Sequence, residues 1–354
     1  MSPIPKTMSG ILVEETGGVE VLQWNTDLPV PTLNDGEVLV RNEDIGVNYI
    51  DTYFRTGLYP KPLPFIPGRE AAGVIIALHP SVTNTTATTP TNRPPLSVGT
   101  RVAYITDQQG AYAELTAVSA RDIVPLPPAI SSDLAAAALL QGLTALTFIR
   151  EAAGLKRPPK DDSNNTDGKD NDNNKRWALV HAAAGGTGSL LSQLLTLHGV
   201  CVIGTAGSAE KRVQAEKWSG AHTVIDTSSE SDLVSRVGEI TEGRGVDIIF
   251  DGVGKATFEL DMQVIARKGT LSGPVPPLDI LRLVPKNIKL LRPGLTAYIE
   301  TQEERDAYTQ ELFELLAEGT LKVNIHKLYP LKEVAQAHVD LEGRKTIGKL
   351  LLKV

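Results

Sequence analysis

Residues 177–198 read WALVHAAAGGTGSLLSQLLTLH, and this stretch decides the fold of the second half of the chain. The apolar start predicts a buried strand, and the leucine-rich end predicts a helix over 188–198. Between them Ala182, Gly185 and Gly188 form an A-x-x-G-x-x-G string. Small residues let the backbone approach a pyrophosphate, and a helix N-terminus supplies N–H donors. This context favours dinucleotide binding over the alternative, in which small residues only ease helix–strand packing.

Strands and helices alternate on both sides of this stretch. A helix rich in alanine and leucine is expected from Asp133 onward. Further strands are expected at VCVIGT (200–205), TVID (223–226), VDIIFDGV (246–253) and GTLSG (269–273). Helices are expected at 209–219, 230–242 and 255–266. Continuous apolar strands joined by amphipathic helices predict a doubly wound parallel sheet, the Rossmann type of α/β fold.

The first part of the chain has a different pattern, with short strand-like runs separated by Gly, Pro and Asn. These runs are ILVEE (11–15), EVLVRNEDI (37–45), AAGVIIAL (71–78), RVAYI (101–105) and AYAELTAV (111–118). They predict an antiparallel, barrel-like β domain. The tail predicts helices at 303–318 and 331–342 and strands at 322–329 and 348–354. Because the tail is too short to be a domain, we expect it to rejoin the first domain.

These patterns predict two domains, residues 1–132 with 293–354 and residues 133–292. Two polar stretches, 83–97 and 156–176, are expected to be surface insertions, since they lack the apolar side chains needed to offset the entropy of ordering.

Composition excludes several classes of function. The chain has 354 residues, a formal net charge of -7 and a sequence pI near 5.5, which argues against a nucleic-acid partner. Cys201 is the single cysteine, so an intramolecular disulfide and a multi-thiolate zinc site are excluded. The six histidines are too scattered to suggest a metal motif, and no metal is expected. No signal peptide or membrane span is predicted, so we expect a cytoplasmic protein that does not associate with membranes.

The type of dinucleotide follows from charge at the end of the second expected strand. NAD enzymes carry a carboxylate there to hold the ribose 2′-hydroxyl. This chain has Ser208 and then Lys211 and Arg212, which suit a 2′-phosphate, so NADPH is preferred as cofactor. The alternative is that the two cations are only a solvated helix face. Two later turns, at Val253 and Ser272, are also expected to contact the cofactor because they follow strands of the same sheet.

Several segments together resemble the NADPH:quinone oxidoreductases of the zeta-crystallin type, which are zinc-free medium-chain dehydrogenases/reductases. They are VNYIDTYFRTGLYP (47–60), PGREAAGV (67–74), LLQGLTA (139–145), HAAAGGTGSLLSQL (181–194), GTAGSAEKR (204–212), FDGVGKATF (250–258) and RKTIGKLLL (344–352). The resemblance implies a GroES-like domain completed by the C-terminal segment, a Rossmann domain, and a homodimer or tetramer. Zinc-dependent relatives have a histidine where this chain has Arg69, which implies metal-free chemistry.

The resemblance also implies the reaction and its residues. Hydride would pass from NADPH to a quinone held in the interdomain cleft. The residues lining the acceptor pocket would be Asn48, Asp51, Tyr53 and Tyr59, with Asn48 and Tyr53 as hydrogen-bond donors. The cofactor-binding residues would be Thr144, Ala184, Gly185, Gly186, Thr187, Gly188, Ser208, Lys211, Thr227, Val253, Ser272 and Lys349.

Two positions depart from the family pattern. Thr227 stands where the family often has an aromatic residue, and the turn after Leu271 is shorter than usual. The short turn is expected to enlarge the acceptor pocket or to weaken the hold on the cofactor.

Three alternative functions remain open from the sequence. Reduction of an alkenal or enone uses the same hydride and the same donors. Some zeta-crystallin-like proteins bind AU-rich RNA, although the acidic balance here speaks against that role. A cofactor-binding protein without activity is favoured only by the short turn after Leu271.

Overall fold

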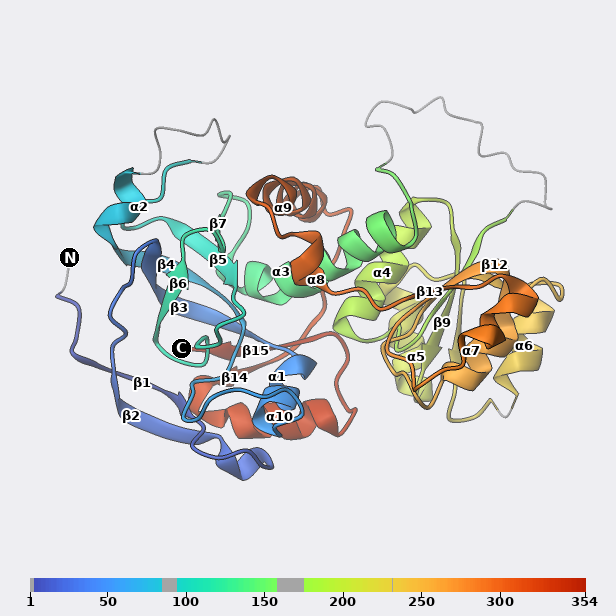
Figure 1. The fold of residues 1–354 in the computed structure, drawn as a ribbon, viewed down its shortest axis with the longest axis horizontal. Coiled ribbons are helices and arrows are strands. Elements are labelled where there is room, and N and C mark those ends of the chain that lie inside the picture. The colour runs from blue at the N-terminus through green and yellow to red at the C-terminus, as the bar shows by residue number, and fades with distance from the viewer. Residues whose placement is uncertain (1–2, 85–93, 158–174, 231) are drawn as a thin grey trace. The chain divides into compact units, whose positions relative to one another are not determined.

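The computed structural model describes residues 3–84, 94–157, 175–230 and 232–354, and the chain divides into two units (Figure 1). The first unit comprises Met1–Leu140, Thr309–Glu318 and Ile325–Val354, and the second comprises Gln141–Tyr308 and Gly319–Asn324. The first division falls inside helix α3 (Ser132–Thr147), later than the predicted boundary at 132/133. The tail returns at 309 rather than at 293. The predicted insertions at 83–97 and 156–176 lie largely outside the described residues.

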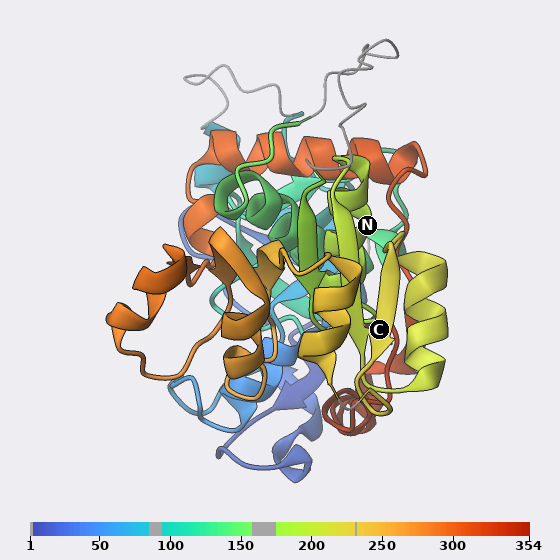
Figure 2. The same ribbon diagram turned by 90° about the vertical axis from the view of Figure 1, so that its right-hand side faces the viewer.

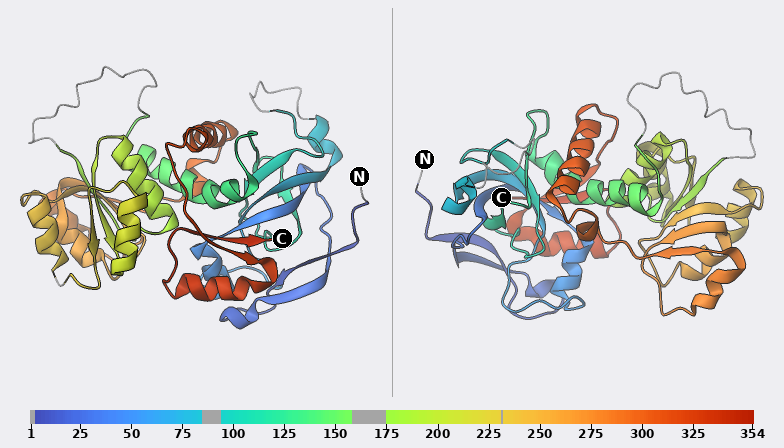
Figure 3. Two further views of the ribbon diagram at one scale, coloured as in Figure 1. Left: turned by 180° about the vertical axis from the view of Figure 1, so that it is seen from behind. Right: turned by 45° about the horizontal axis from the view of Figure 1, so that its top comes forward.

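A mostly antiparallel sheet of seven strands is the framework of the first unit. Its long strand β3 (Glu37–Val47) pairs with β4 (Glu70–Leu78), β6 (Leu115–Ser119) and β15 (Lys349–Lys353). Register shifts along β3 curve the strand, so it can serve several neighbours in a barrel-like arrangement. Strands from both ends of the sequence therefore share one sheet, as Figure 3 shows.

The remaining elements of the first unit are short. The other sheet strands are β5 (Arg101–Ile105), β7 (Ile123–Pro125) and β14 (Ile325–Pro330), and β1 (Thr7–Leu12) and β2 (Gln23–Pro29) form a separate pair. The helices are α1 (Tyr49–Arg55), α2 (Pro80–Asn84) and α10 (Val334–Glu342), with the 3₁₀ turns η1 (Val19–Val21) and η7 (Leu331–Glu333). Helix α9 (Gln302–Ala317) runs from the second unit into the first.

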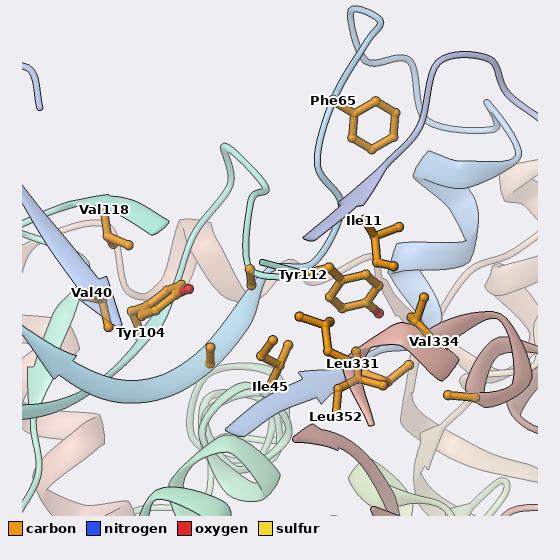
Figure 4. Close-up of a cluster of buried hydrophobic side chains, with 14 of the residues drawn as sticks. Ile11, Val40, Ile45, Phe65, Tyr104, Tyr112, Val118, Leu331, Val334 and Leu352 are labelled. Atoms are coloured by element: carbon orange, nitrogen blue, oxygen red, sulfur yellow. The ribbon is translucent and has the colours of Figure 1, made fainter. Parts of the chain in front are cut away.

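One apolar cluster explains why the tail belongs to the first unit. Ile45, Tyr104 and Tyr112 come from the N-terminal part of the chain and are fully buried. Figure 4 shows Leu331, Val334 and Leu352 of the tail within the same core. Because those side chains fill the space between the sheet and α10, the first unit would lack part of its core without the tail.

The second unit is built on six parallel strands in the order β10-β9-β8-β11-β12-β13. The strands are β8 (Trp177–Val180), β9 (Cys201–Ala206), β10 (Thr223–Asp226), β11 (Val246–Phe250), β12 (Ile265–Ser272) and β13 (Lys289–Leu291). The connecting helices are α4 (Gly186–Leu197), α5 (Ala209–Trp218), α6 (Leu233–Ile240) and α7 (Phe258–Val264). Helices α4 and α5 cover one face, and α6 and α7 cover the other (Figures 1 and 2). The predicted doubly wound parallel sheet is confirmed.

The strand order fixes where a ligand can bind. The chain builds β8, β9 and β10 outward in one direction and then crosses back to place β11 on the other side of β8. At such a switch point the loops after β8 and β11 diverge and leave a crevice at the carboxyl ends of the strands. Most of the predicted cofactor residues lie at the ends of β8, β9, β11 and β12, in the loops that follow them or in the first turns of the next helices.

Helix α3 and the π-helical segment that follows it form one long apolar stretch, Ser132–Ala152. Within the described residues it is the one helix long and apolar enough to cross a membrane by length and composition. Its most apolar window is 67% buried inside the protein, which is typical of a core helix. The stretch therefore serves the protein core.

Candidate active site

The loop after β8 is packed tightly, and at Gly188 the fold itself requires glycine. Gly185 is the N-cap of α4, and a Cβ at Gly188 would lie 2.4 Å from the carbonyl oxygen of Ala182. A Cβ at Gly186 would meet the side chain of Gln141 at 2.7 Å. Ala184 is buried and Thr187 is half-buried in the first turn of α4. The glycines therefore bring the loop and the start of α4 close together, and the first N–H groups of α4 lie just after this loop.

The end of β9 offers no carboxylate. Ala206 ends the strand, and the hydroxyl of Ser208 caps α5 by accepting the N–H of Lys211 at 3.3 Å. Lys211 lies in the first turn of α5, while Arg212 pairs with Glu216 at 2.7 Å. Thr227, exposed after β10, donates its hydroxyl to the Ala206 carbonyl at 3.1 Å. Predicted residues Ser208, Lys211 and Thr227 are thus gathered around the end of β9.

The turns after β11 and β12 lie against each other. A Cβ at Gly273 would be only 2.1 Å from the carbonyl oxygen of Asp251. Val253 is 43% exposed at the tip of its turn. The hydroxyl oxygen of Ser272 is buried and has no hydrogen-bond partner among the described residues. A buried hydroxyl without a partner, next to Gly273, fits contact with a dinucleotide, because a polar atom of the dinucleotide would supply the missing hydrogen bond.

A buried cluster that sequence reasoning missed joins the loop after β8 to the turn after β11. His181 follows β8, Asp251 follows β11 and Asp261 lies on α7, and their ligand atoms all lie within 4.8 Å of one another. His181 Nε2 is 2.8 Å from Asp261 Oδ1. Such a set can hold a metal ion, but the two oxygens of Asp251 already accept the N–H groups of Val253 and Gly254 and the hydroxyl of Thr257. These three side chains therefore form a hydrogen-bonded cluster.

The predicted acceptor residue Asn48 is held by a buried ion pair in the first unit. Lys349 Nζ donates to Asn48 Oδ1 at 2.8 Å and to Glu70 Oε2 at 2.6 Å. Asn48 in turn donates to Glu70 at 3.0 Å and to the carbonyl of Gly46 at 3.2 Å. Both amide hydrogens of Asn48 are therefore engaged, and donation to an acceptor would require exchange of one of these bonds. Lys349, predicted among the cofactor residues, lies beside Asn48.

Asp51 is fully buried at the start of α1. Its Oδ2 accepts the N–H of Asn48 at 2.9 Å and the hydroxyl of Tyr112 at 2.8 Å, while Oδ1 has no partner among the described residues. Burial raises the pKa of Asp51 to about 6, although its hydrogen bonds act in the opposite direction.

A chain of hydrogen bonds continues from Tyr112 to α10. The Tyr112 hydroxyl lies 3.1 Å from His338 Nε2, and His338 Nδ1 lies 3.2 Å from Arg55 Nη1. Arg55 forms a bidentate pair with Glu342 at 2.9 and 2.8 Å. Burial, and then the charge of Arg55, lower the pKa of His338 to about 3, so the imidazole is neutral. This chain fixes both ends of α1 within the first unit.

Aromatic rings surround the exposed side of α1. Tyr53 packs edge-on against Tyr49 and Tyr59, with ring centroids 5.5 and 5.3 Å apart, and Phe54 packs against Tyr59 at 5.7 Å. The predicted residues Tyr53 and Tyr59 are both half-buried, so part of each ring remains accessible. Such a group of rings can contact a flat aromatic molecule.

Arg69 occupies the turn in which zinc-dependent relatives have histidine. Its guanidinium donates from Nε to the carbonyl of Thr106 at 3.1 Å and pairs with Asp107. The predicted acceptor residues all lie in the first unit, and the predicted cofactor residues other than Lys349, including half-buried Thr144 on α3, lie in the second.

Comparisons with known proteins cover nearly the whole chain. The model for the alcohol dehydrogenase GroES-like domain matches residues 34–128, and the model for a zinc-binding dehydrogenase matches residues 219–352. A probable quinone oxidoreductase of Schizosaccharomyces pombe is 38% identical, covering 98% of this chain and 97% of the relative. Quinone oxidoreductase 1 of Escherichia coli is 37% identical, covering 95% and 96%.

A solved structure gives the same result. Escherichia coli quinone oxidoreductase complexed with NADPH matches with a TM-score of 0.85 at 35% sequence identity, covering 98% of this chain and 100% of that one. With the two-unit architecture and the strand order described above, these matches show that the chain belongs to the quinone oxidoreductase family of medium-chain dehydrogenases/reductases.

Proposed function

We propose that this protein transfers a hydride from NADPH to a quinone. The observation that carries the cofactor is the set of groups at the carboxyl ends of the parallel strands of the second unit: the tight glycine loop after β8, the unpartnered hydroxyl of Ser272 and the end of β9 without a carboxylate. The printed names of the relatives, together with the NADPH in the Escherichia coli structure, support the acceptor and the cofactor.

The residues of this chain bind and orient the reactants. NADPH supplies the hydride, and the N-terminus of α4 would hold its pyrophosphate. Lys211 would pair with the 2′-phosphate, and the hydroxyl of Ser272 would form a hydrogen bond with the cofactor. Tyr53 and Tyr59 would stack on the quinone ring, while Glu70 and Lys349 keep Asn48, the N-cap of α1, in one orientation.

The proposed chemistry uses no catalytic zinc. The guanidinium of Arg69 is a cation in the turn where a zinc ligand would be needed, and it is already paired with Asp107. The single cysteine, Cys201, begins strand β9 and lies far in sequence from that turn. Neither residue suits a zinc site of the alcohol dehydrogenase kind.

We further propose a cytoplasmic homodimer. Strand β13 is at one edge of the six-stranded sheet, and the 3₁₀ segment η6 (Ile280–Lys286) precedes it. Ile280, Leu281 and Val284 on η6 are 73%, 68% and 62% exposed, an apolar surface beside an open strand edge. Both features suit a second copy of this chain.

Steady-state oxidation of NADPH tests the function. We expect turnover with 9,10-phenanthrenequinone, little with a 2-alkenal, and a lower Michaelis constant for NADPH than for NADH. Faster turnover with the alkenal would mean that the acceptor is an alkenal or enone and not a quinone. If neither acceptor oxidises NADPH and AU-rich RNA is bound at physiological salt, the protein is not the proposed enzyme.

A further inference from the structure

We propose that Asp261 and His181 are positioning residues that tie the turn after β11 to the loop after β8 and so set the affinity for the cofactor. This inference rests on the proposed function, since it assumes that both loops hold NADPH. Neither side chain is expected to touch the cofactor. Their effect would pass through the backbone of the turn 251–254 and of the loop 181–188.

His181 lies where three strands end. Its N–H donates to the carbonyl of Phe250 at 3.1 Å, which joins the end of β8 to the end of β11. Its Nδ1 is 3.2 Å from the hydroxyl of Thr205 on β9, and that hydroxyl also accepts the N–H of Ala182 at 3.3 Å. Ala182 has φ +52, a left-handed conformation that disfavours alanine. The bonds around His181 therefore help to hold the start of the glycine loop in a strained conformation.

Asp251 shapes the second turn. Its Oδ1 accepts the N–H of Val253 at 2.7 Å and that of Gly254 at 3.0 Å, and its Oδ2 accepts the Thr257 hydroxyl at 2.8 Å. Gly254 has φ +89, which glycine adopts without strain, so the turn can close around these bonds. The same carboxylate thus determines where the exposed Val253 lies.

Asp261 connects the loop after β8, through His181, to the turn after β11, through Asp251. One of its oxygens bonds His181, and the other, Oδ2, is buried without a partner among the described residues. Asp251 is close enough for its carboxylate to raise the pKa of Asp261, which burial and this neighbour bring to about 6. A proton on Oδ2 would be shared with Asp251, since two buried carboxylates side by side do not both ionise readily. The titratable groups facing Asp261 in this cluster are His181 and Asp251.

Substitution of Asp261 separates positioning from catalysis. D261N keeps an oxygen for His181 and an N–H donor for Asp251, whereas D261A removes both. The matched control is D247N, because Asp247 lies on β11 at the end of that strand opposite to the turn 251–254 and accepts the N–H of Trp177 at 2.8 Å. We expect D261A to raise the dissociation constant for NADPH about tenfold with kcat at saturating NADPH changed less than twofold. D261N and D247N should stay within about threefold of the parent protein.

Hydrogen exchange without cofactor provides an independent measurement. In the cofactor-free protein, peptides covering 251–257 should exchange faster in D261A than in the parent and D247N. An unchanged dissociation constant and unchanged exchange in D261A would overturn the inference, and so would a D261N protein as weak as D261A. If D261A fails to fold, the comparison of H181Q with D247N decides in the same way. A parent protein that does not bind NADPH would contradict the proposed function, whereas the exchange result would still judge the positioning role.

Discussion

Lys211 is the residue on which the choice of cofactor depends. Its first-turn position on α5, beside the capping hydroxyl of Ser208, follows from local sequence alone and was predictable. We expect K211A to raise the Michaelis constant for NADPH about tenfold and to leave that for NADH nearly unchanged, because only NADPH carries a 2′-phosphate. Steady-state kinetics with both cofactors checks this. K217A, in the last turn of the same helix, is the control and should alter neither constant.

Gly188 tests whether the glycine loop is set by the fold or only by the ligand. Because its Cβ would lie 2.4 Å from the Ala182 carbonyl, G188A should lower the free energy of unfolding by about 1–3 kcal/mol even without cofactor. Gly238 on α6 has no atom within 4 Å of its Cβ position, so G238A should be neutral or stabilise by about 0.5–1 kcal/mol. Urea unfolding measures both. Equal stability of G188A and the parent would leave the pyrophosphate as the reason for this glycine.

At this scale the sequence predicts contacts between neighbouring residues and gives no signal for partners that are distant in the chain. The residues of the glycine loop lie within a few positions of each other, so their roles follow from spacing. Lys349 and Asn48 are 301 residues apart, and Tyr112 and His338 are 226 residues apart. No local pattern could pair them. Asp261 was missed for the same reason, because its partner His181 is 80 residues away.

Among the elements, α1 shows where sequence patterns mislead. YIDTYFR is rich in aromatic and β-branched residues, which favour strands, and no helix was predicted there. The Asp51 carboxylate reaches back to the N–H of Asn48 and closes the first turn, while Arg55 ties the last turn to Glu342. Tertiary contacts thus decide this helix. The strands of the second unit, by contrast, were predictable because their apolar runs are continuous.

The contact of α1 with α10 makes stability depend on pH in a defined direction. His338 has a pKa of about 3 in the folded protein, below its ordinary 6.5, so between these values only the unfolded chain binds the proton. Its contribution to stability is therefore full above pH 6.5 and is lost as the pH falls toward 3. Asp51, with its pKa raised from 3.8 to about 6, acts oppositely and loses stability as the pH rises between those values.

Replacing His338 removes its pH-dependent contribution to the free energy of unfolding and leaves that of Asp51. Between pH 6.5 and pH 5, H338Q should gain about 2 kcal/mol of unfolding free energy relative to the parent protein, whatever its stability at pH 7. Urea unfolding at several pH values gives this difference. H326Q, which changes an exposed histidine of the same unit, is the control. A constant difference between H338Q and the parent across this range would mean that His338 is charged or accessible.

At the scale of the whole molecule, the chain order of the units was predictable in outline. The switch from short, interrupted strands to alternating strands and helices marks the two folds, and the tail's core residues return to the first. The boundaries were not predictable to the residue, because α3 and α9 each run through a division between units. Continuous helices carry no break in pattern at such a point.

The proposed dimer is the feature that only the assembled molecule can test. A charge on η6 would have to be desolvated if a second copy covers Ile280 and Val284, so the double variant I280D/V284D should shift the protein from dimer to monomer at micromolar concentration. Light scattering after size-exclusion chromatography measures the mass. L328D, on a 47% exposed leucine of β14 in the other unit, is the control and should leave the mass unchanged. Strand β13 would remain paired with β12 in the variant. A monomeric variant that keeps its affinity for NADPH would therefore show that cofactor binding does not depend on dimer formation. A parent protein with the mass of one chain, or a variant that remains dimeric, would place any contact between copies elsewhere.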